Sequence, residues 1–193
     1  TLRQASQLIL AAHRPLLVCH VAPDGDALGS LTGLAQALRQ LDMSPIMACA
    51  DTIPSGFDYI PGTDSIVRHV NETFDLVIAL DCSDRNRLGE FTDLPHFDQH
   101  SLINIDHHIT VVDPEASSTA EVVLELLDYL DVSIDEPLAT SLLAGIVTDT
   151  RGFRTNNVAP RVLRAALKLM EAGASLPYVS RYGLDRRPLV AVR

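Results

Sequence analysis

Three short apolar runs in this sequence each end on side chains that could bind a metal ion. Residues 101–105 (SLINI) are followed directly by Asp106, His107 and His108. An apolar run of this length with two isoleucines is typical of a buried strand. Ionisable groups at the end of such a strand are costly to bury unless a partner of opposite charge compensates them. A cation is the simplest partner for one carboxylate and two imidazoles.

The same arrangement occurs twice more along the chain. Strands of an open α/β sheet deliver the residues at their carboxyl ends to one shared crevice, so these three strand ends should meet. Taken alone, the segment Asp24-Gly25-Asp26 is as typical of an ordinary turn as of a metal site, and only the residues after all three strands together predict a metal site. The further residues of that set are His20, Asp24 and Asp26 after the run 16–19, and Asp81 after the run 76–80.

Asp149 adds a carboxylate from a different kind of element. It lies near the end of a predicted apolar helix, where the helix dipole disfavours a negative charge, so we expect a cation beside it. Four acids and two imidazoles suit two divalent ions that share one bridging carboxylate. A mixed oxygen-and-imidazole set without thiolate favours Mn²⁺, with Mg²⁺ or Co²⁺ as alternatives. Two such ions about 4 Å apart would activate a bridging water for hydrolysis at phosphorus.

The elements that must position these residues alternate between strand and helix patterns. The segment 51–62 is rich in Pro and Gly and is predicted as loop, and Ser118 with Glu121 has the spacing of a capping box. We therefore expect an α/β fold with a largely parallel sheet flanked by helices, and a helical C-terminal part. The predicted strands are 16–20, 44–50, 74–80 and 101–105, and the predicted helices are 2–12, 27–41, 118–130, 136–150 and 160–172.

Composition and charge exclude several classes of protein. The chain has 193 residues, 47% of them hydrophobic, which is enough for one domain with a sizeable core. No apolar run approaches the roughly 18 residues of a membrane span, so we expect no membrane association. The net charge of −10 argues against a protein that coats duplex DNA. Cys19, Cys49 and Cys82 are odd in number and not in CxxC spacing, which favours a cytoplasmic protein.

The sequence contains four motifs with candidate ligands, which are residues 20–30 (HVAPDGDALGS), 81–84 (DCSD), 104–108 (NIDHH) and 145–150 (GIVTDT). In this order they resemble the DHH phosphoesterase superfamily. Within that superfamily the first motif is similar to the nano-RNase branch, whose members are oligoribonucleases and phosphoadenosine-phosphate phosphatases. RecJ-type exonucleases and family II pyrophosphatases share the metal ligands but differ around the first motif.

The resemblance implies a role for each matching residue. His108 would face the substrate phosphate as proton donor or charge stabiliser, so His108 and the bridging Asp81 are the catalytic candidates. Asp106 would lie behind the metal ligands and orient an imidazole. The implied ligands of one Mn²⁺ are His20, Asp24 and Asp81, and those of the other are Asp26, Asp81, His107 and Asp149.

Weaker candidates could bind the substrate phosphate. Ser118, with Ser117 and Thr119, could donate to a phosphate from a helix N-terminus, although ordinary capping explains these residues about as well. Arg85 and Arg154 follow the second and fourth motifs and could also bind phosphate, although arginines are common on protein surfaces.

The resemblance also implies a domain organisation and a substrate class. Residues 1–175 would form the DHH catalytic domain, and residues 176–193 would begin a linker to a C-terminal substrate-binding domain that is absent from this sequence. The expected substrates are short single-stranded RNA or small nucleotides, such as phosphoadenosine phosphate or linear dinucleotides. Alternatives are a nucleotide-binding or regulatory module without turnover of its own, a single-strand exonuclease and an inorganic pyrophosphatase. Members of the family often pair, so a homodimer is also expected.

Overall fold

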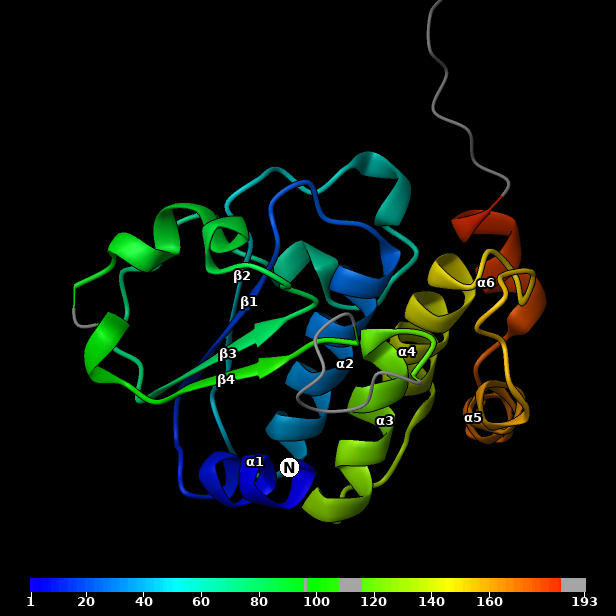
Figure 1. Cartoon of the computed structure of the whole chain (residues 1–193), viewed down its shortest axis with the longest axis horizontal. Helices are drawn as coiled ribbons and strands as arrows, with labels where there is room; N and C mark the ends of the chain where they lie inside the picture. Colours follow the sequence, from blue (N-terminus) through cyan, green and yellow to red (C-terminus); the bar gives the residue numbers. More distant parts are fainter. Residues whose placement is uncertain (96, 108–115, 185–193) are drawn as a thin grey trace, which may run out of the picture.

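A computed structural model describes residues 1–95, 97–107 and 116–184 of the chain. Its sheet has four strands, all parallel, in the order β2-β1-β3-β4 (Figure 1). This arrangement confirms the predicted α/β fold with a parallel sheet, and no strand extends more than one residue beyond its predicted range. The strands are β1 (Pro15–Cys19), β2 (Ile46–Ala48), β3 (Leu76–Leu80) and β4 (Leu102–Ile105).

All five predicted helices form, with ends within two residues of the predicted ones. Short 3-10 turns occupy the connections between the later strands, including η1 (Ser55–Phe57) in the predicted loop, η2 (Thr63–Ser65), η3 (Arg85–Asp93) and η4 (Phe97–Gln99). The helices are α1 (Leu2–Leu10), α2 (Gly25–Gln40), α3 (Thr119–Leu130), α4 (Glu136–Asp149), α5 (Pro160–Glu171) and α6 (Leu176–Gly183).

Helix α6 lies in the segment that the sequence predicts as the start of a linker. The side chain of Ser175 caps the helix by accepting from the Tyr178 N–H, and Val179 is fully buried. Gly183 comes so close to α4 that a Cβ built on it would lie 3.1 Å from the Thr148 methyl group. This first part of the segment is therefore folded against the domain. The rest, residues 185–193, lies outside the described residues, so the predicted domain boundary stays a prediction.

The two faces of the sheet are covered by different layers. Helices α2, α3 and α4 lie on one side, and the 3-10 turns of residues 85–99 lie on the other (Figure 1). Side chains alternate between the faces of a strand, so Leu17 of β1 packs into the helical core while Leu16 packs against Leu88 and Phe91. Because both faces are buried, β1 and β3 are apolar at every position, which produces the continuous apolar runs before the candidate ligands.

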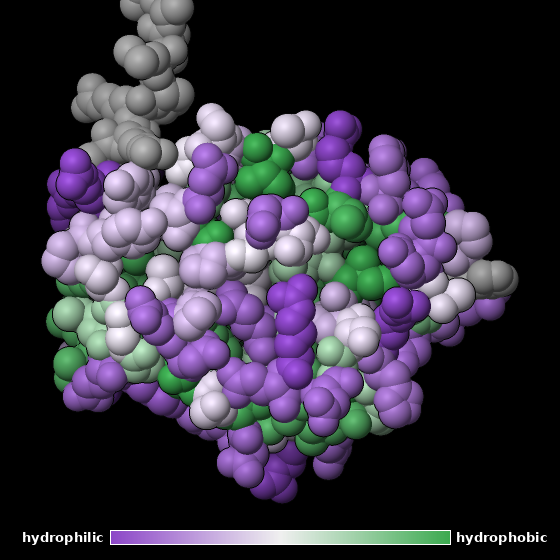
Figure 2. Space-filling model, turned by 180° about the vertical axis from the view of Figure 1, so that it is seen from behind, coloured by the Kyte–Doolittle hydropathy of each residue, from purple (hydrophilic) through white to green (hydrophobic). Residues whose placement is uncertain are grey.

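The outer surface is largely polar on the side opposite to Figure 1. Hydrophilic residues predominate in Figure 2, and apolar residues gather in smaller patches between them. Among the helices of the described residues, none combines the length and apolarity that crossing a bilayer requires.

Candidate metal centre

Residues from three strand ends converge at the carboxyl edge of the sheet. His20 follows β1, Asp81 follows β3, and Asp106 and His107 follow β4. Strands β1 and β3 are neighbours, but the chain leaves β1 for β2 on one side and leaves β3 for β4 on the other. Open α/β sheets bind ligands at this kind of switch point, because the connections diverge and leave a crevice between them.

The first group of candidate ligands consists of His20, Asp24 and Asp81. Their donor atoms lie within 4.8 Å of one another, and His20 Nε2 is 3.3 Å from Asp81 Oδ2 and 3.9 Å from Asp24 Oδ1. His20 Nδ1 lies 2.7 Å from the Val21 carbonyl oxygen, which can only accept, so Nδ1 carries a proton. In the neutral ring the lone pair of Nε2 then faces two carboxylates. Either a proton on Nε2 or a cation between these groups would remove this repulsion.

The second group consists of Asp26, His107 and Asp149, whose donor atoms also lie within 4.8 Å of one another. His107 Nε2 is 3.6 Å from Asp149 Oδ2 and 4.0 Å from Asp26 Oδ2. The same nitrogen lies 3.9 Å from Asp81 Oδ1. Asp81 therefore turns one oxygen toward each imidazole, and the two groups meet at its carboxylate.

The backbone of Asp81 is held in an unusual conformation. Its φ is 57°, in the left-handed region that residues with a side chain rarely adopt. Its N–H donates to the Ile105 carbonyl oxygen at 3.0 Å, which extends the pairing of β3 with β4 by one residue. Such conformations cost about 1–3 kcal/mol and gather at functional sites, because the surrounding structure must enforce them.

Asp26 is held by the N-terminus of α3, although it belongs to α2. Its side chain is 1% exposed and accepts from the Thr119 N–H at 2.6 Å and from the Ala120 N–H at 2.9 Å. Free N–H groups and the positive end of the helix dipole make this a favourable place for a carboxylate. Residues 93 positions apart in the sequence are brought together here.

The electrostatics of the site show a surplus of buried negative charge. Burial, with the charges of Asp81 and Asp149, raises the pKa of the Asp26 carboxyl well above its usual range. Burial also opposes the charged form of Asp81, but the hydrogen bond and charge of His20 outweigh it and lower the pKa of Asp81. Burial works against protonation of His20, yet the hydrogen bond to Asp81 leaves its pKa raised. Divalent cations fit this donor set of carboxylates and imidazoles, because they would compensate the charge that the fold gathers.

The structure places only some of the residues that were predicted to act beside the metal ligands. Asp106 is buried directly after β4, and His108 lies outside the described residues. The hydroxyl of Ser118 accepts from the Glu121 N–H at 3.2 Å and so caps α3. The predicted capping box is wrong in its second half. The Glu121 carboxylate accepts from the N–H and the hydroxyl of Ser117, one residue earlier than predicted, at 2.7 and 2.8 Å.

The two candidate arginines make contacts outside the ligand groups. Arg85 forms an ion pair with Asp98, and its guanidinium lies 5.3 Å from the centre of the Phe97 ring, on the side of the sheet that the 3-10 turns cover. Arg154 donates through Nε to the Arg151 carbonyl oxygen at 2.8 Å. Phosphate binding by Arg85 or Arg154 therefore stays a prediction.

Two features of the site were missed by the interpretation of the sequence. The N–H of Thr119 donates to Asp26 and its hydroxyl donates to Asp81, whereas the sequence suggested donation to a phosphate. Gly145, inside buried α4, makes room for the site: a Cβ built on it would lie 2.5 Å from the Ala120 Cβ and 2.7 Å from Asp26 Oδ1. A glycine within the apolar, buried part of α4, from Leu138 to Val147, was the available signal, since glycine is otherwise unfavourable inside a helix.

Replacing Gly145 with alanine should therefore weaken both the fold and metal binding. The added methyl group must push against Asp26 and α3, and overpacking of this kind costs roughly 1–3 kcal/mol. Chemical denaturation and a Mn²⁺ titration would measure the two effects. Gly33→Ala is the matched control, since its methyl group would lie 2.5 Å from Leu142 Cδ2 and contact no candidate ligand, so it should cost stability but leave Mn²⁺ affinity unchanged. Wild-type stability and Mn²⁺ affinity in Gly145→Ala would contradict this description of the site.

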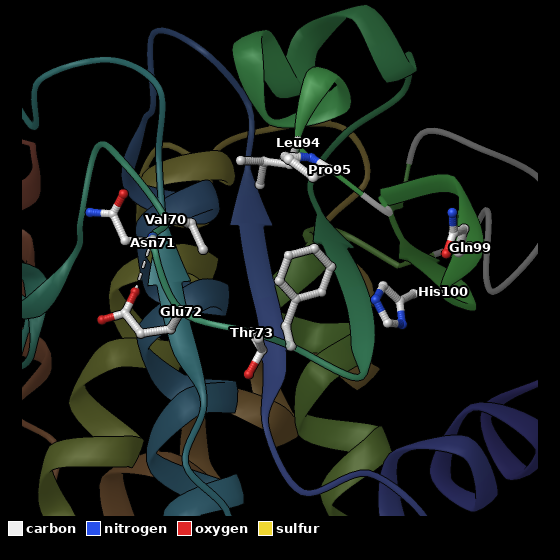
Figure 3. A pocket seen from close by; sticks show the side chains of 9 residues that line it. Val70, Asn71, Glu72, Thr73, Leu94, Pro95, Gln99 and His100 are labelled. Atoms are coloured by element: carbon white, nitrogen blue, oxygen red, sulfur yellow. Dashed lines mark hydrogen bonds between the residues drawn. The ribbon is translucent and has the colours of Figure 1, made fainter.

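A separate cavity of about 750 Å³ lies on the face of the sheet that the 3-10 turns cover (Figure 3). It is lined by residues that precede β3 and β4, among them Phe74 and His100, whose ring centres are 4.9 Å apart. Its lining includes one carboxylate, from Glu72, and one imidazole, from His100. These groups are too few to form a two-metal site. The candidate metal centre therefore lies at the carboxyl edge of the sheet.

Comparisons with known proteins agree with this fold and show the family of the chain. Two relatives named bifunctional oligoribonuclease and PAP phosphatase NrnA, from Thermus thermophilus and Bacillus subtilis, are 34% and 30% identical over 91% and 79% of this chain. The chain covers 55% and 51% of their lengths, so it spans about half of these curated relatives. An exopolyphosphatase-related protein from Bacteroides fragilis has a crystal structure that matches with a TM-score of 0.87 at 25% identity, covering 96% of this chain and 60% of that one. Residues 15–146 match the DHH family, N-terminal domain, and the chain belongs to that family.

Proposed function

We propose that this chain is the catalytic domain of a metal-dependent phosphoesterase that acts on short oligoribonucleotides or small nucleotides. Phosphoadenosine phosphate and linear dinucleotides are the small substrates we expect. One observation carries the proposal: two groups of metal-binding side chains meet across the Asp81 carboxylate at the switch point of the sheet. The names of the two curated relatives, an oligoribonuclease and PAP phosphatase in each case, support the substrate class.

We infer that two divalent ions, Mn²⁺ first and Mg²⁺ or Co²⁺ as alternatives, complete the site. When bound, they would lower the pKa of a shared water and neutralise phosphoryl oxygens. Asp81 would serve both ions, because each of its oxygens faces a different imidazole. The remaining ligands would be His20 and Asp24 for one ion, and Asp26, His107 and Asp149 for the other.

His108 is our candidate for the group that gives a proton to the leaving oxygen. It follows the ligand His107 directly in the DHH motif, and an imidazole can donate a proton near neutral pH. Asp106 would orient an imidazole from behind the ligands. Ser118 is the weakest of the phosphate-binding candidates, because its hydroxyl already caps α3.

A nucleotide-binding module without turnover of its own is the second candidate. It is favoured by one observation, that the chain spans about half the length of the curated relatives. Residues 1–175 would then hold the metal ions, and a domain reached through residues 176–193 would supply most of the contacts to the substrate. Either function uses the same metal site, so hydrolysis separates them.

The deciding experiment follows hydrolysis of a 5′-labelled RNA dinucleotide by metal-free protein to which Mn²⁺ is returned. We expect cleavage that depends on Mn²⁺ and two Mn²⁺ ions per chain by elemental analysis. Two bound ions and a tightly bound but intact dinucleotide would favour the binding module. Release of phosphate from pyrophosphate would instead favour the pyrophosphatase alternative, and a protein that binds no metal would contradict the proposal.

Two further expectations about the intact protein stay predictions. The chain should pair with a second copy, which sedimentation equilibrium would detect as twice the chain mass. The cytoplasm is the compartment we propose, because Cys19, Cys49 and Cys82 are all free and buried.

A further inference from the structure

Thr119 contacts both groups of candidate ligands. Its backbone N–H donates to Asp26 Oδ2 at 2.6 Å, and its hydroxyl donates to Asp81 Oδ1 at 3.0 Å. The residue is fully buried, so water does not compete for either hydrogen bond. Asp26 belongs to one ligand group and Asp81 to the other. Thr119 therefore connects the two groups from behind.

The hydroxyl of Thr119 restricts the direction in which the Asp81 carboxylate faces. The hydroxyl proton is used on Oδ1, while Oδ2 lies 3.3 Å from His20 Nε2. Rotating the carboxylate plane would disturb both contacts together. In the observed orientation Oδ1 also lies 3.9 Å from His107 Nε2, so each oxygen faces a different imidazole. Hydrogen-bond partners behind ligating carboxylates orient them and tune metal binding in this way.

We propose that Thr119 is a positioning residue that holds the Asp81 carboxylate in the orientation in which it can serve two metal ions. The inference rests on the proposed two-metal function and adds a residue that lies outside both groups of candidate ligands. Because the backbone N–H of Thr119 holds Asp26 at the same time, a shift of the first turn of α3 would move ligands of both groups.

Thr119→Val tests this proposal with little change of shape. The variant loses the hydroxyl but keeps the backbone N–H that binds Asp26. We expect Mn²⁺ affinity to fall roughly 10- to 100-fold, and kcat for the dinucleotide to fall while KM stays near its wild-type value. The exchange coupling between two Mn²⁺ ions, seen by electron paramagnetic resonance, should change as well. Thr119→Ser restores the hydroxyl and should restore all three measurements.

Thr32→Val is the matched control. Thr32 is also fully buried, and its hydroxyl donates to the Leu28 carbonyl oxygen within α2 at 2.9 Å. This variant should bind Mn²⁺ and turn over as the wild type does. If Thr119→Val does not fold by circular dichroism, Thr119→Cys, which keeps a weaker donor, takes its place in the same comparison.

The outcomes separate this inference from the proposed function. A wild-type protein that binds no Mn²⁺ would overturn both. A wild type that binds two ions and cleaves the dinucleotide, beside a folded Thr119→Val that binds and cleaves equally well, would overturn the positioning role alone. Loss of affinity and coupling in Thr119→Val with recovery in Thr119→Ser would support it.

Discussion

Asp81→Ala should reduce hydrolysis of the dinucleotide by roughly 10³-fold or more, because residues that act as one catalytic unit cannot be removed singly without losing most of the rate. Asp81 lies 3.3 Å from His20 Nε2 and 3.9 Å from His107 Nε2, so its removal opens a gap between both ligand groups at once. Mn²⁺ binding should fall together with turnover. Initial rates and a Mn²⁺ titration on the same preparation would measure both.

Asp64→Ala is the matched control for this change. Asp64 is also an aspartate, but it is exposed and lies in the 3-10 turn η2, away from the carboxyl edge of the sheet. Its replacement should leave turnover and metal content unchanged. If Asp81→Ala keeps more than about a tenth of the wild-type rate, the shared-carboxylate description of the site is wrong, since a tenfold effect corresponds to only about 1.4 kcal/mol.

Returning Mn²⁺ to the metal-free protein should raise its melting temperature by roughly 10–20 °C. A ligand that binds only the folded state stabilises it by about 2.7 kcal/mol per site at a free concentration of 100 Kd, and two sites contribute twice that amount. For a domain of this size each kcal/mol corresponds to about 2–4 °C. Part of this binding free energy comes from the carboxylates, because the buried Asp26 and Asp81 and the half-buried Asp149 repel one another until a cation compensates them. Differential scanning calorimetry with and without chelator would measure the shift.

Asp149→Asn tests where this stabilisation comes from. The variant removes a negative charge from the C-terminal end of α4, so the metal-free protein should be as stable as the wild type or slightly more stable. The increase in melting temperature that Mn²⁺ produces should fall to about half of the wild-type increase, because one of the two metal sites is weakened. A melting temperature of the wild type that does not respond to Mn²⁺ would contradict the proposed metal centre.

The sequence by itself determined the local elements and the positions of the candidate ligands. The continuous apolar runs before His20 and Asp81 predicted β1 and β3 correctly, because strands buried on both faces need apolar side chains at every position. The run before Asp106 predicted β4 as well, but that strand is buried only at Ile103 and Ile105 and is exposed at Leu102 and Asn104. The first residues of α3, α4 and α5 were predictable to within two residues, since Ser118, Asp135 and Pro160 mark these helix starts locally. Such signals lie within a few residues of the element they specify.

Only the tertiary structure decided how the site is held together. The hydrogen bonds from α3 to Asp26 join residues 93 and 94 positions apart, and no periodicity or spacing encodes these contacts. The inward direction of Thr119, the space that Gly145 leaves beside Asp26 and the docking of α6 depend equally on packing between distant elements. The physical reason is that the types of ligand follow from local chemistry, whereas their orientation follows from long-range contacts that form only in the folded chain.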